Sequence, residues 1–483
     1  MPRLRILSVV SECVPFAKTG GLADVAGALP IALAARGHDV RTVMPRYRVV
    51  KKHPAKKLPI SLAVPVGMGD AWCGVYESQL GDTDARVYAL EHDELFDRSG
   101  IYNDANGDYR DNLARFTVLS RGAIRLAGAL GFEPDVVHVH DWPACLAPIY
   151  MKTLDARSPL GRAASVLSIH NMGYQGWFDK NELFQTRLGW DVFHQRGIES
   201  YDSINLLKGG LYFSTVISTV SPTYAREIQT KAGGHGLEGA LADRGGGVIG
   251  ILNGIDDEIW NPKTDRHLAA HFDHEDLRGK AICKAELQKE MGLPERPDVP
   301  LVGIISRLVE QKGIDIFAGA LSRLLAEDVQ FVVLGSGEAW AEDLFKRLNE
   351  STPNFRARLG MNEPLAHRIE AGVDLFVMPS RYEPCGLNQL YSQRYGTLPV
   401  VRAVGGLEDT VEHMVTGFKF HELSPEALTG TMLEALYIYR YHPEHFRSMQ
   451  RRAMKKPLGW DYASAQYEAL YRLAISKHAS QRR

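Results

Sequence analysis

Short apolar runs alternate with amphipathic helical patterns along the chain. An apolar run at residues 4–10 is followed by a glycine loop, a helical pattern at about 22–35 and a second apolar run at 40–44. Buried parallel strands have such near-continuous apolar runs, and helices connect them. The pattern therefore predicts an α/β fold with a doubly wound sheet. Further strands are expected at residues 135–139, 164–169 and 215–220.

The same alternation starts again past the middle of the chain. Strands are expected at residues 300–305, 330–334, 374–378 and 398–401, and a helix from about Trp460. Because 483 residues exceed what one core holds, two domains are expected. A glycine-rich stretch from Gly245 to Gly254 suits a hinge. We predict Rossmann-like domains at 1–248 and 249–457, and a helix at 458–483 that packs back on the first domain.

Composition and charge exclude several classes of function. The formal net charge is −2 and no long basic run occurs, which argues against nucleic acid as a partner. No window approaches about 18 consecutive apolar residues, so no membrane span is expected. The apolar run at the N-terminus is too short for a signal peptide. The five cysteines include no Cys-x-x-Cys pair, which favours a reducing cytoplasm over a disulfide framework or a zinc site.

A glycine loop follows the first expected strand, in the string Lys18-Thr19-Gly20-Gly21. Glycines let backbone N–H groups approach an anion, a helix N-terminus adds partial positive charge, and Lys18 adds a full charge. The alternative is a turn that only lets the helix pack closely on the strand. The loop is not Gly-x-Gly-x-x-Gly, so it lacks the dinucleotide fingerprint.

Two cations and two further glycine loops follow strands of the second half. Arg307 and Lys312 would stabilise the negative charge that develops on a diphosphate leaving group. The alternative is a pair of solvated surface cations. Gly335-Ser336 and Gly406-Leu407 could offer N–H groups to phosphate or nucleotide, or could be ordinary turns.

Polar residues at other strand ends point to a hydroxyl-rich ligand. Glu383 could accept hydrogen bonds from sugar hydroxyls, or could form a salt bridge to Arg381. His170 could bond a sugar hydroxyl, act as a general base or be a satisfied core histidine, and Asp141 could orient a hydroxyl. Cys385 has no activating base nearby in sequence and is interpreted as a buried structural thiol. His138 and His140 lack a third ligand, so we expect no metal.

These strings, in this order, resemble the bacterial and plant glycogen (starch) synthase family. The resemblance covers essentially the whole chain and rests on seven strings. They are KTGGLADV from Lys18, HDWPA from His140, IHNMGYQG from Ile169, LNGID from Leu252, SRLVEQKGID from Ser306, LGSGE from Leu334 and PSRYEPCGLNQLYSQRYG from Pro379.

The resemblance implies the GT-B fold, in which two Rossmann-like domains flank an interdomain cleft. It implies an enzyme that transfers glucose from ADP-glucose to the non-reducing 4-hydroxyl of glycogen or another α-1,4-glucan, with retention of configuration. Basic residues and loop amides handle the diphosphate in that family, so no metal or other cofactor is expected. The first domain would hold the acceptor and the second the nucleotide sugar.

The resemblance also implies roles for individual residues. Lys18, Arg307 and Lys312 would contact the donor phosphates, Glu383 the donor glucose, and Tyr102 the acceptor. His170 would line the reacting face, where its backbone carbonyl could support oxocarbenium character. Asp141 and Asn253 would hold hydroxyls. The remaining donor-binding positions would be Gly20, Gly21, Asp24, Gly335, Ser336, Met361, Cys385, Gly386, Gly406 and Leu407.

Two departures from the family pattern bear on the donor. Met361 stands where bacterial members often carry a tyrosine that stacks on adenine, although a methionine can still pack against a base. The string RAVGGLEDTV, from Arg402, replaces the commoner RTGGLADTV, and the segment between Val411 and Phe418 is shorter than typical. Closure of this loop over the diphosphate could therefore differ.

Three other functions compete with this interpretation. A related GT-B enzyme would use UDP-glucose or another acceptor, such as a sucrose-type or trehalose-type sugar. A catalytically silent glucan-binding protein would keep the fold, but it would not need Lys18, Arg307, Lys312 and Glu383 together. A nucleotide-cofactor oxidoreductase is disfavoured because the Gly-x-Gly-x-x-Gly fingerprint is absent after the first expected strand.

Overall fold

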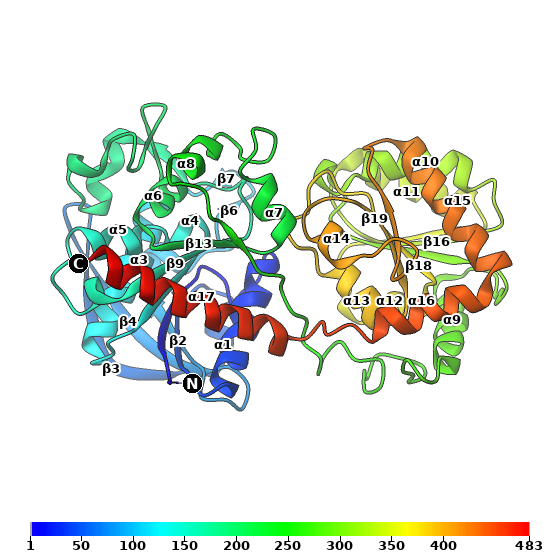
Figure 1. Ribbon diagram of the computed structural model, residues 1–483, viewed down its shortest axis with the longest axis horizontal. Coiled ribbons are helices and arrows are strands. Elements are labelled where there is room, and N and C mark those ends of the chain that lie inside the picture. The colour runs from blue at the N-terminus through cyan, green and yellow to red at the C-terminus, as the bar shows by residue number, and fades with distance from the viewer. Residues whose placement is uncertain (1, 483) are drawn as a thin grey trace. The chain divides into compact units, whose positions relative to one another are not determined.

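The structure is a computed structural model that describes residues 2–482. The chain forms two compact units, each a sheet covered by helices (Figure 1). One unit contains the chain up to Val220, Ala225–Ile251 and the chain from Trp460 on. The other contains Ser221–Tyr224 and Leu252–Gly459. The expected α/β architecture is thereby confirmed.

The first unit is built on a nine-stranded sheet within the described residues, in the order β14-β13-β9-β8-β1-β2-β5-β4-β3. Strands β14 to β5 in this order pair in parallel, whereas β4 and β3 pair antiparallel. The strands are β1 (Arg5–Val9), β2 (Asp39–Pro45), β3 (Lys56–Val66), β4 (Gly69–Gln79), β5 (Arg86–Glu91), β8 (Val136–His140), β9 (Ala164–Ile169), β13 (Val216–Thr219) and β14 (Ile249–Gly250).

The antiparallel hairpin β3–β4 was not expected from the sequence. Residues along these strands alternate between buried and exposed positions instead of forming a continuous apolar run. An antiparallel strand with one solvated face has this weaker signal. Lys56 and Lys57 begin the edge strand β3, where charge discourages pairing with another chain.

Helices cover both faces of this sheet, and smaller strands extend its loops (Figure 1). The C-terminal helix α17 lies against α1, and both contribute to one apolar cluster with the sheet. The helices are α1 (Gly21–Ala35), α2 (Asp93–Phe96), α3 (Asn112–Ala129), α4 (Asp141–Ala144), α5 (Leu146–Lys152), α6 (Leu206–Phe213), α7 (Pro222–Glu227), α8 (Glu238–Asp243) and α17 (Trp460–Gln481). The small strands are β6 (Asn103–Asp104), β7 (Gly107–Asp108), β10 (Trp177–Asp179), β11 (Glu199–Ser200) and β12 (Ser203–Asn205).

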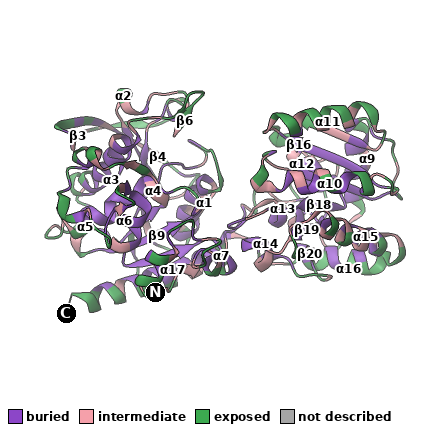
Figure 2. Cartoon of the chain, turned by 90° about the horizontal axis from the view of Figure 1, so that it is seen from above, coloured by how far each residue is buried: buried purple, intermediate pink, exposed green. Residues whose placement is uncertain are grey.

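The second unit is built on a six-stranded parallel sheet within the described residues, in the order β17-β16-β15-β18-β19-β20. Counted along the chain this is the order 3-2-1-4-5-6 of a Rossmann sheet. The strands are β15 (Leu301–Ile305), β16 (Gln330–Gly335), β17 (Phe355–Leu359), β18 (Leu375–Met378), β19 (Leu398–Arg402) and β20 (Phe418–Phe420). Figure 2 shows buried strands between helices whose outer sides are exposed.

The helices of the second unit flank this sheet. They are α9 (Arg278–Met291), α10 (Ile314–Leu324), α11 (Ala339–Ser351), α12 (Glu363–Gly372), α13 (Asn388–Arg394), α14 (Gly405–Thr410), α15 (Pro425–Tyr441) and α16 (Pro443–Met454). The long helices are amphipathic; α10, for example, buries Ile314, Phe317, Leu321 and Leu324 on one side. Among residues 2–482, no helix combines the length and apolar character that a membrane crossing requires.

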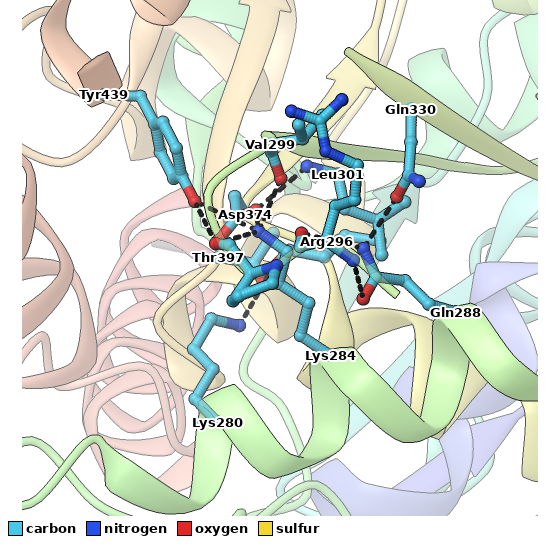
Figure 3. A network of polar contacts seen from close by, with 12 residues as sticks. Lys280, Lys284, Gln288, Arg296, Val299, Leu301, Gln330, Asp374, Thr397 and Tyr439 are labelled. Carbon is cyan, nitrogen blue, oxygen red and sulfur yellow. Dashed lines mark hydrogen bonds and ion pairs between the residues drawn. The ribbon is translucent and has the colours of Figure 1, made fainter. Parts of the chain in front are cut away.

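A polar network fixes helix α9 to the sheet of the second unit (Figure 3). The Lys284 ammonium donates to the Asp374 carboxylate at 2.7 Å and to the Val299 carbonyl at 2.6 Å. One turn earlier, the Lys280 ammonium donates to the Thr397 hydroxyl at 2.7 Å. Buried charges need such partners, because an unpaired charge in the core is strongly destabilising.

Candidate active site

The expected site residues of the first unit gather where its strand order reverses. Counted along the chain, the seven parallel strands of this sheet have the order 3-2-1-4-5-6-7, with β1 as 1 and β8 as 4, so the order reverses between these two strands. Ligands of open α/β sheets bind at the carboxyl ends of strands at such a point. Glu12 lies just after β1, and Asp141 directly follows β8.

Glu12 organises the glycine loop before α1. Its carboxylate accepts hydrogen bonds from the backbone N–H and the hydroxyl of Thr19, the latter at 2.7 Å, and from the N–H of Gly20 at 3.3 Å. The side chain is almost fully buried. The loop amides were expected to donate to a phosphate, but in the structure two of them donate to the Glu12 carboxylate.

The two glycines of this loop leave open space. Apart from chain neighbours and the backbone of α1 itself, no heavy atom of the described residues lies within 4 Å of a Cβ built at Gly20 or Gly21. The alternative that these glycines serve close packing is therefore wrong. That role belongs to Gly27, where a Cβ would meet the Val14 carbonyl at 2.6 Å. Lys18 beside the loop is exposed and pairs with Asp24, in the first turn of α1, at 2.7 Å.

Tyr102 joins the glycine loop through Glu12. Its hydroxyl lies 2.6 Å from Oε1 of Glu12, to which it donates, and 2.7 Å from the Ser11 hydroxyl. The ring also lies near Trp142, with ring centroids 6.2 Å apart. The expected acceptor residue and the expected phosphate loop therefore share one carboxylate.

Asp141 and His170 are brought together at the ends of adjacent strands. The Asp141 carboxylate accepts the backbone N–H of His170 at 2.7 Å. Asp141 holds a left-handed backbone with φ of 54°, which is uncommon for a residue other than glycine. Burial raises the pKa of Asp141 to about 7, against the lowering effect of backbone hydrogen bonds from His170 and Asn171. Strain and a perturbed carboxyl are typical of functional sites.

His170 is the end of a buried chain of histidines. Its Nε2 lies 2.9 Å from Nδ1 of His140, whose ring lies 4.0 Å from that of His138. His138 in turn is 2.9 Å from the hydroxyl of Tyr471 in α17. Burial lowers the pKa of His170 to about 3. So weak a base is a poor proton acceptor at neutral pH, which disfavours the general-base interpretation.

The second unit has a cavity of about 110 Å³ at its own reversal of strand order. The ends of β15 and β18 line it, together with Lys312, Glu383 and Gly386. In the 3-2-1-4-5-6 order, β15 and β18 are the strands between which the order reverses. The cavity thus lies where a Rossmann sheet binds its ligand.

Lys312 and Glu383 form an ion pair in this cavity. The Lys312 ammonium lies 2.6 Å from Oε2 of Glu383, and the side chains are 20% and 7% exposed. The Ser380 hydroxyl donates to the same oxygen at 3.2 Å. The alternative that Lys312 is a solvated surface cation is therefore wrong. The alternative that Glu383 pairs with Arg381 is also wrong, because Arg381 pairs with Glu310 and Asp315.

Arg307, Gly335, Ser336 and Met361 lie on neighbouring loops of the second unit. Arg307 is exposed, and its guanidinium donates to the Gln311 side chain at 3.1 Å. The next residue, Leu308, donates its N–H to the Ser336 carbonyl at 2.8 Å. A Cβ at Gly335 would collide with the Ser306 carbonyl, so this glycine serves close packing of the loops. Met361 is 81% exposed.

The remaining expected positions surround Glu383. Gly406 donates its N–H to the Glu383 carbonyl at 3.1 Å, and Leu407 donates to Val404 at 3.0 Å, so both amides have partners within the unit. Gly386 has a φ of 74°, in the left-handed region that favours glycine. Cys385 is buried, and burial raises the pKa of its thiol to about 12, as expected for a thiol that stays protonated at neutral pH.

Asn253 carries an unsatisfied acceptor. The residue is 8% exposed, and its Oδ1 is buried with no hydrogen-bond partner among the described residues. Buried polar atoms are rarely left unpaired, and one in a candidate site suggests a ligand that donates to it. The described part of the chain holds no group of three or more His, Cys, Asp or Glu side chains arranged to bind a metal ion.

Glu12 was not expected from the sequence to contribute to the site, and His140 was considered only as a metal ligand. Glu12 comes two positions after the end of the first expected strand, so the rule that ligands bind at strand ends could have found it. Its partners are a loop and a tyrosine that lies 90 residues away, and no local pattern indicates such contacts.

The sequence is similar to characterised families over its whole length. Residues 5–243 match the family described as the starch synthase catalytic domain, and residues 299–437 match glycosyl transferases group 1. A glycogen synthase 1 of Geobacter metallireducens is 48% identical over 100% of this chain and 98% of its own. A glycogen synthase of Anaeromyxobacter sp. strain Fw109-5 is 50% identical over 97% of this chain and 99% of its own.

The fold is similar to that of a solved plant enzyme. The catalytic domain of starch synthase IV from Arabidopsis thaliana, bound to ADP and acarbose, superposes with a TM-score of 0.91. The likeness covers 98% of this chain and 100% of that one, at 32% sequence identity.

Proposed function

The chain belongs to the glycogen and starch synthase family of glycosyltransferases, and from this premise we propose ADP-glucose as its donor. Membership makes it a retaining glucosyltransferase of GT-B fold that extends an α-1,4-glucan at the non-reducing 4-hydroxyl. The observation that carries the choice of donor is the ADP in the related starch synthase IV, whose fold this chain shares over nearly its whole length.

We propose that Lys18, Arg307 and Lys312 bind the donor diphosphate. Arg307 and Lys18 are exposed at loop ends, where a phosphate can reach them. Lys312 is held in place by Glu383, so its charge is positioned before the donor arrives. A cation fixed in advance stabilises the leaving diphosphate more in the transition state than in the ground state. The open space at Gly20 and Gly21 leaves room for an anion beside α1.

The donor glucose is assigned to the groups around Glu383. A carboxylate in a cavity is a strong acceptor for sugar hydroxyls. Asn253 Oδ1, buried and without a partner among residues 2–482, would accept a further hydroxyl. His170 and Asp141 would line the reacting face, and Tyr102 the acceptor. The remaining residues of the proposed donor site are Asp24, Gly335, Ser336, Met361, Cys385, Gly386, Gly406 and Leu407.

The reaction then needs no protein nucleophile. Cys385, beside the proposed sugar site, holds its proton at neutral pH because burial raises its pKa to about 12. His170 is neutral and a weak base. We therefore propose that the leaving phosphate takes the proton of the acceptor hydroxyl on the same face of the sugar, which retains the configuration. Metal ions have no part in this proposal.

The test is transfer of labelled glucose onto glycogen from ADP-glucose and from UDP-glucose, with a chelator present. We expect preference for ADP-glucose and loss of at least a hundredfold of the rate in Glu383→Ala, the range for a group that acts in the transition state. Arg381→Ala is the matched control, since Arg381 is near in sequence but pairs elsewhere. Preference for UDP-glucose would overturn the donor, and an active Glu383→Ala enzyme would overturn the site.

Met361 provides a second test of the donor. Its side chain is 81% exposed, so a base could pack against it without displacing the core. Met361→Tyr should lower the KM for ADP-glucose, because an aromatic ring stacks on adenine better than a thioether does. An unchanged KM would remove Met361 from the proposed base site.

We also propose a cytoplasmic location. All five cysteines are buried free thiols, as suits a reducing compartment. Fractionation of cells that express the tagged protein should recover it with cytoplasmic markers, and recovery with the periplasm would contradict the proposal.

A further inference from the structure

Two aromatic side chains stand exposed side by side on the small sheet formed by β10, β12 and β11. Trp177 is 46% exposed and Tyr201 is 84% exposed. Their ring centroids are 6.5 Å apart and their planes are inclined by 36°. Single exposed aromatic residues are common, but an adjacent pair on a rigid element presents a shaped apolar surface. We call this pair the aromatic platform.

The turn that carries Tyr201 is strained. Tyr201 and Asp202 form the two-residue connection between β11 and β12, and both have left-handed backbones, with φ of 49° and 60°. Such turns favour Asn-Gly or Asp-Gly, because side chains other than glycine and asparagine resist this conformation. A tyrosine at this position lowers the stability of the fold, and backbone strain of this kind is typical of functional positions.

Polar contacts hold the strained turn in place. The Asp202 carboxylate pairs with Lys180 at 2.5 Å, and the Asp202 N–H donates to the Glu199 carboxylate at 3.0 Å. The Asp202 and Glu199 carboxylates beside the rings therefore both have hydrogen-bond partners. The surface thus offers aromatic faces beside hydrogen-bonding groups, which fits a hydroxyl-rich ligand.

The platform is joined to the proposed acceptor site by packing. Phe178, next to Trp177 in β10, lies against Trp142, with ring centroids 5.9 Å apart. Trp142 lies 6.2 Å from the ring of Tyr102. The strand that carries Trp177 is thus held by the aromatic residue that also contacts Tyr102.

We propose that the aromatic platform binds an α-1,4-glucan strand of the acceptor, away from the reacting end. This inference rests on the proposed function. Sugar rings stack their C–H faces on aromatic rings, and a curved α-1,4-linked chain presents successive rings at an angle, as Trp177 and Tyr201 do. A protein partner is disfavoured, because two rings are far smaller than the roughly 800 Å² per partner of a stable interface.

The test compares long and short acceptors. Tyr201→Asn removes the ring but keeps a residue that tolerates the left-handed turn, so the variant should fold. We expect its KM for glycogen to rise about tenfold, the equivalent of one lost stacking contact, with kcat and the KM for a maltotriose acceptor unchanged. Trp177→Ala should also raise the KM for glycogen. Tyr201→Phe keeps the ring and should have the glycogen KM of the unmodified protein.

Trp190→Ala is the matched control. Trp190 is 61% exposed, but it meets Phe193 edge-on at 79°, so the two rings present no shared face. An unchanged glycogen KM in Tyr201→Asn, or an equal rise in Trp190→Ala, would overturn the platform. A dimeric unmodified protein with a monomeric Tyr201→Asn variant would assign the surface to a second copy and overturn the platform too. Failure of the proposed function is distinct, since the unmodified protein would then transfer glucose to neither acceptor.

Discussion

Nδ1 of His140 lies 2.9 Å from Nε2 of His170, and both rings are buried. One nitrogen must donate and the other accept, so each ring fixes the tautomer and the orientation of the other. Burial lowers the pKa of both rings, to about 3 for His170. The residue proposed at the reacting face is thus a neutral imidazole oriented by a second one.

His140→Phe should reduce catalysis without greatly changing donor binding. The variant removes the hydrogen-bond partner of His170 while filling the space. We expect kcat to fall about a hundredfold, as misplacement of an active-site group can produce, with a small change in the KM of the donor. Steady-state kinetics check this. Ser8→Ala is the control, because it removes only the 3.4 Å contact on the other side of His140 and should leave kcat unchanged.

Glu12→Gln should loosen the glycine loop. An amide can accept from Tyr102, but its NH2 group would then face the N–H groups of Thr19 and Gly20. Leaving such donors unpaired costs on the order of 1–3 kcal/mol. We expect a raised KM for the donor in initial-rate measurements. Tyr102→Phe should instead raise the KM for the glucan, and a pattern in which both variants changed the same KM would contradict the division of roles.

Acid should weaken the attachment of the C-terminal helix. Hydrogen bonds from Arg472 and Arg36 lower the pKa of Glu468 in α17 to about 2, from an ordinary 4.5. A carboxyl whose folded pKa is depressed gives stability that is present above its unfolded pKa and lost as pH falls toward the folded pKa. The melting temperature should therefore drop between about pH 4.5 and 2. In Glu468→Gln the drop should be smaller; an equal drop would assign the effect to other groups.

Lys284→Met should destabilise the second unit strongly. The substitution leaves the Asp374 carboxylate in the core without its cation (Figure 3). Removing one partner of a buried pair costs about 3–5 kcal/mol. Denaturant unfolding measures the loss, and Lys289→Met, exposed on the same helix, is the control. Adding Asp374→Asn should recover part of the loss, because the pair acts as a unit; additive losses would argue against the ion pair.

The sequence by itself determined the parallel strands and the family. The expected strands 164–169 and 398–401 agree with β9 and β19 to within a residue. Fully buried strands have near-continuous apolar runs, which are visible in the local sequence. The hairpin β3–β4 was missed, since its half-exposed strands alternate and carry a weaker signal. Spacing and residue type also predicted Lys312 and Glu383, separately, as candidate site residues.

Only the tertiary structure decided which of these residues meet. Glu383 pairs with Lys312, which is 71 positions away in the chain. It does not pair with Arg381, which is only two positions away. Glu12 joins Tyr102 to the glycine loop, and His140 meets His170 across two strands. Periodicity records which face a residue presents, whereas partners are chosen by strand order and register, and these depend on contacts between residues remote in the chain.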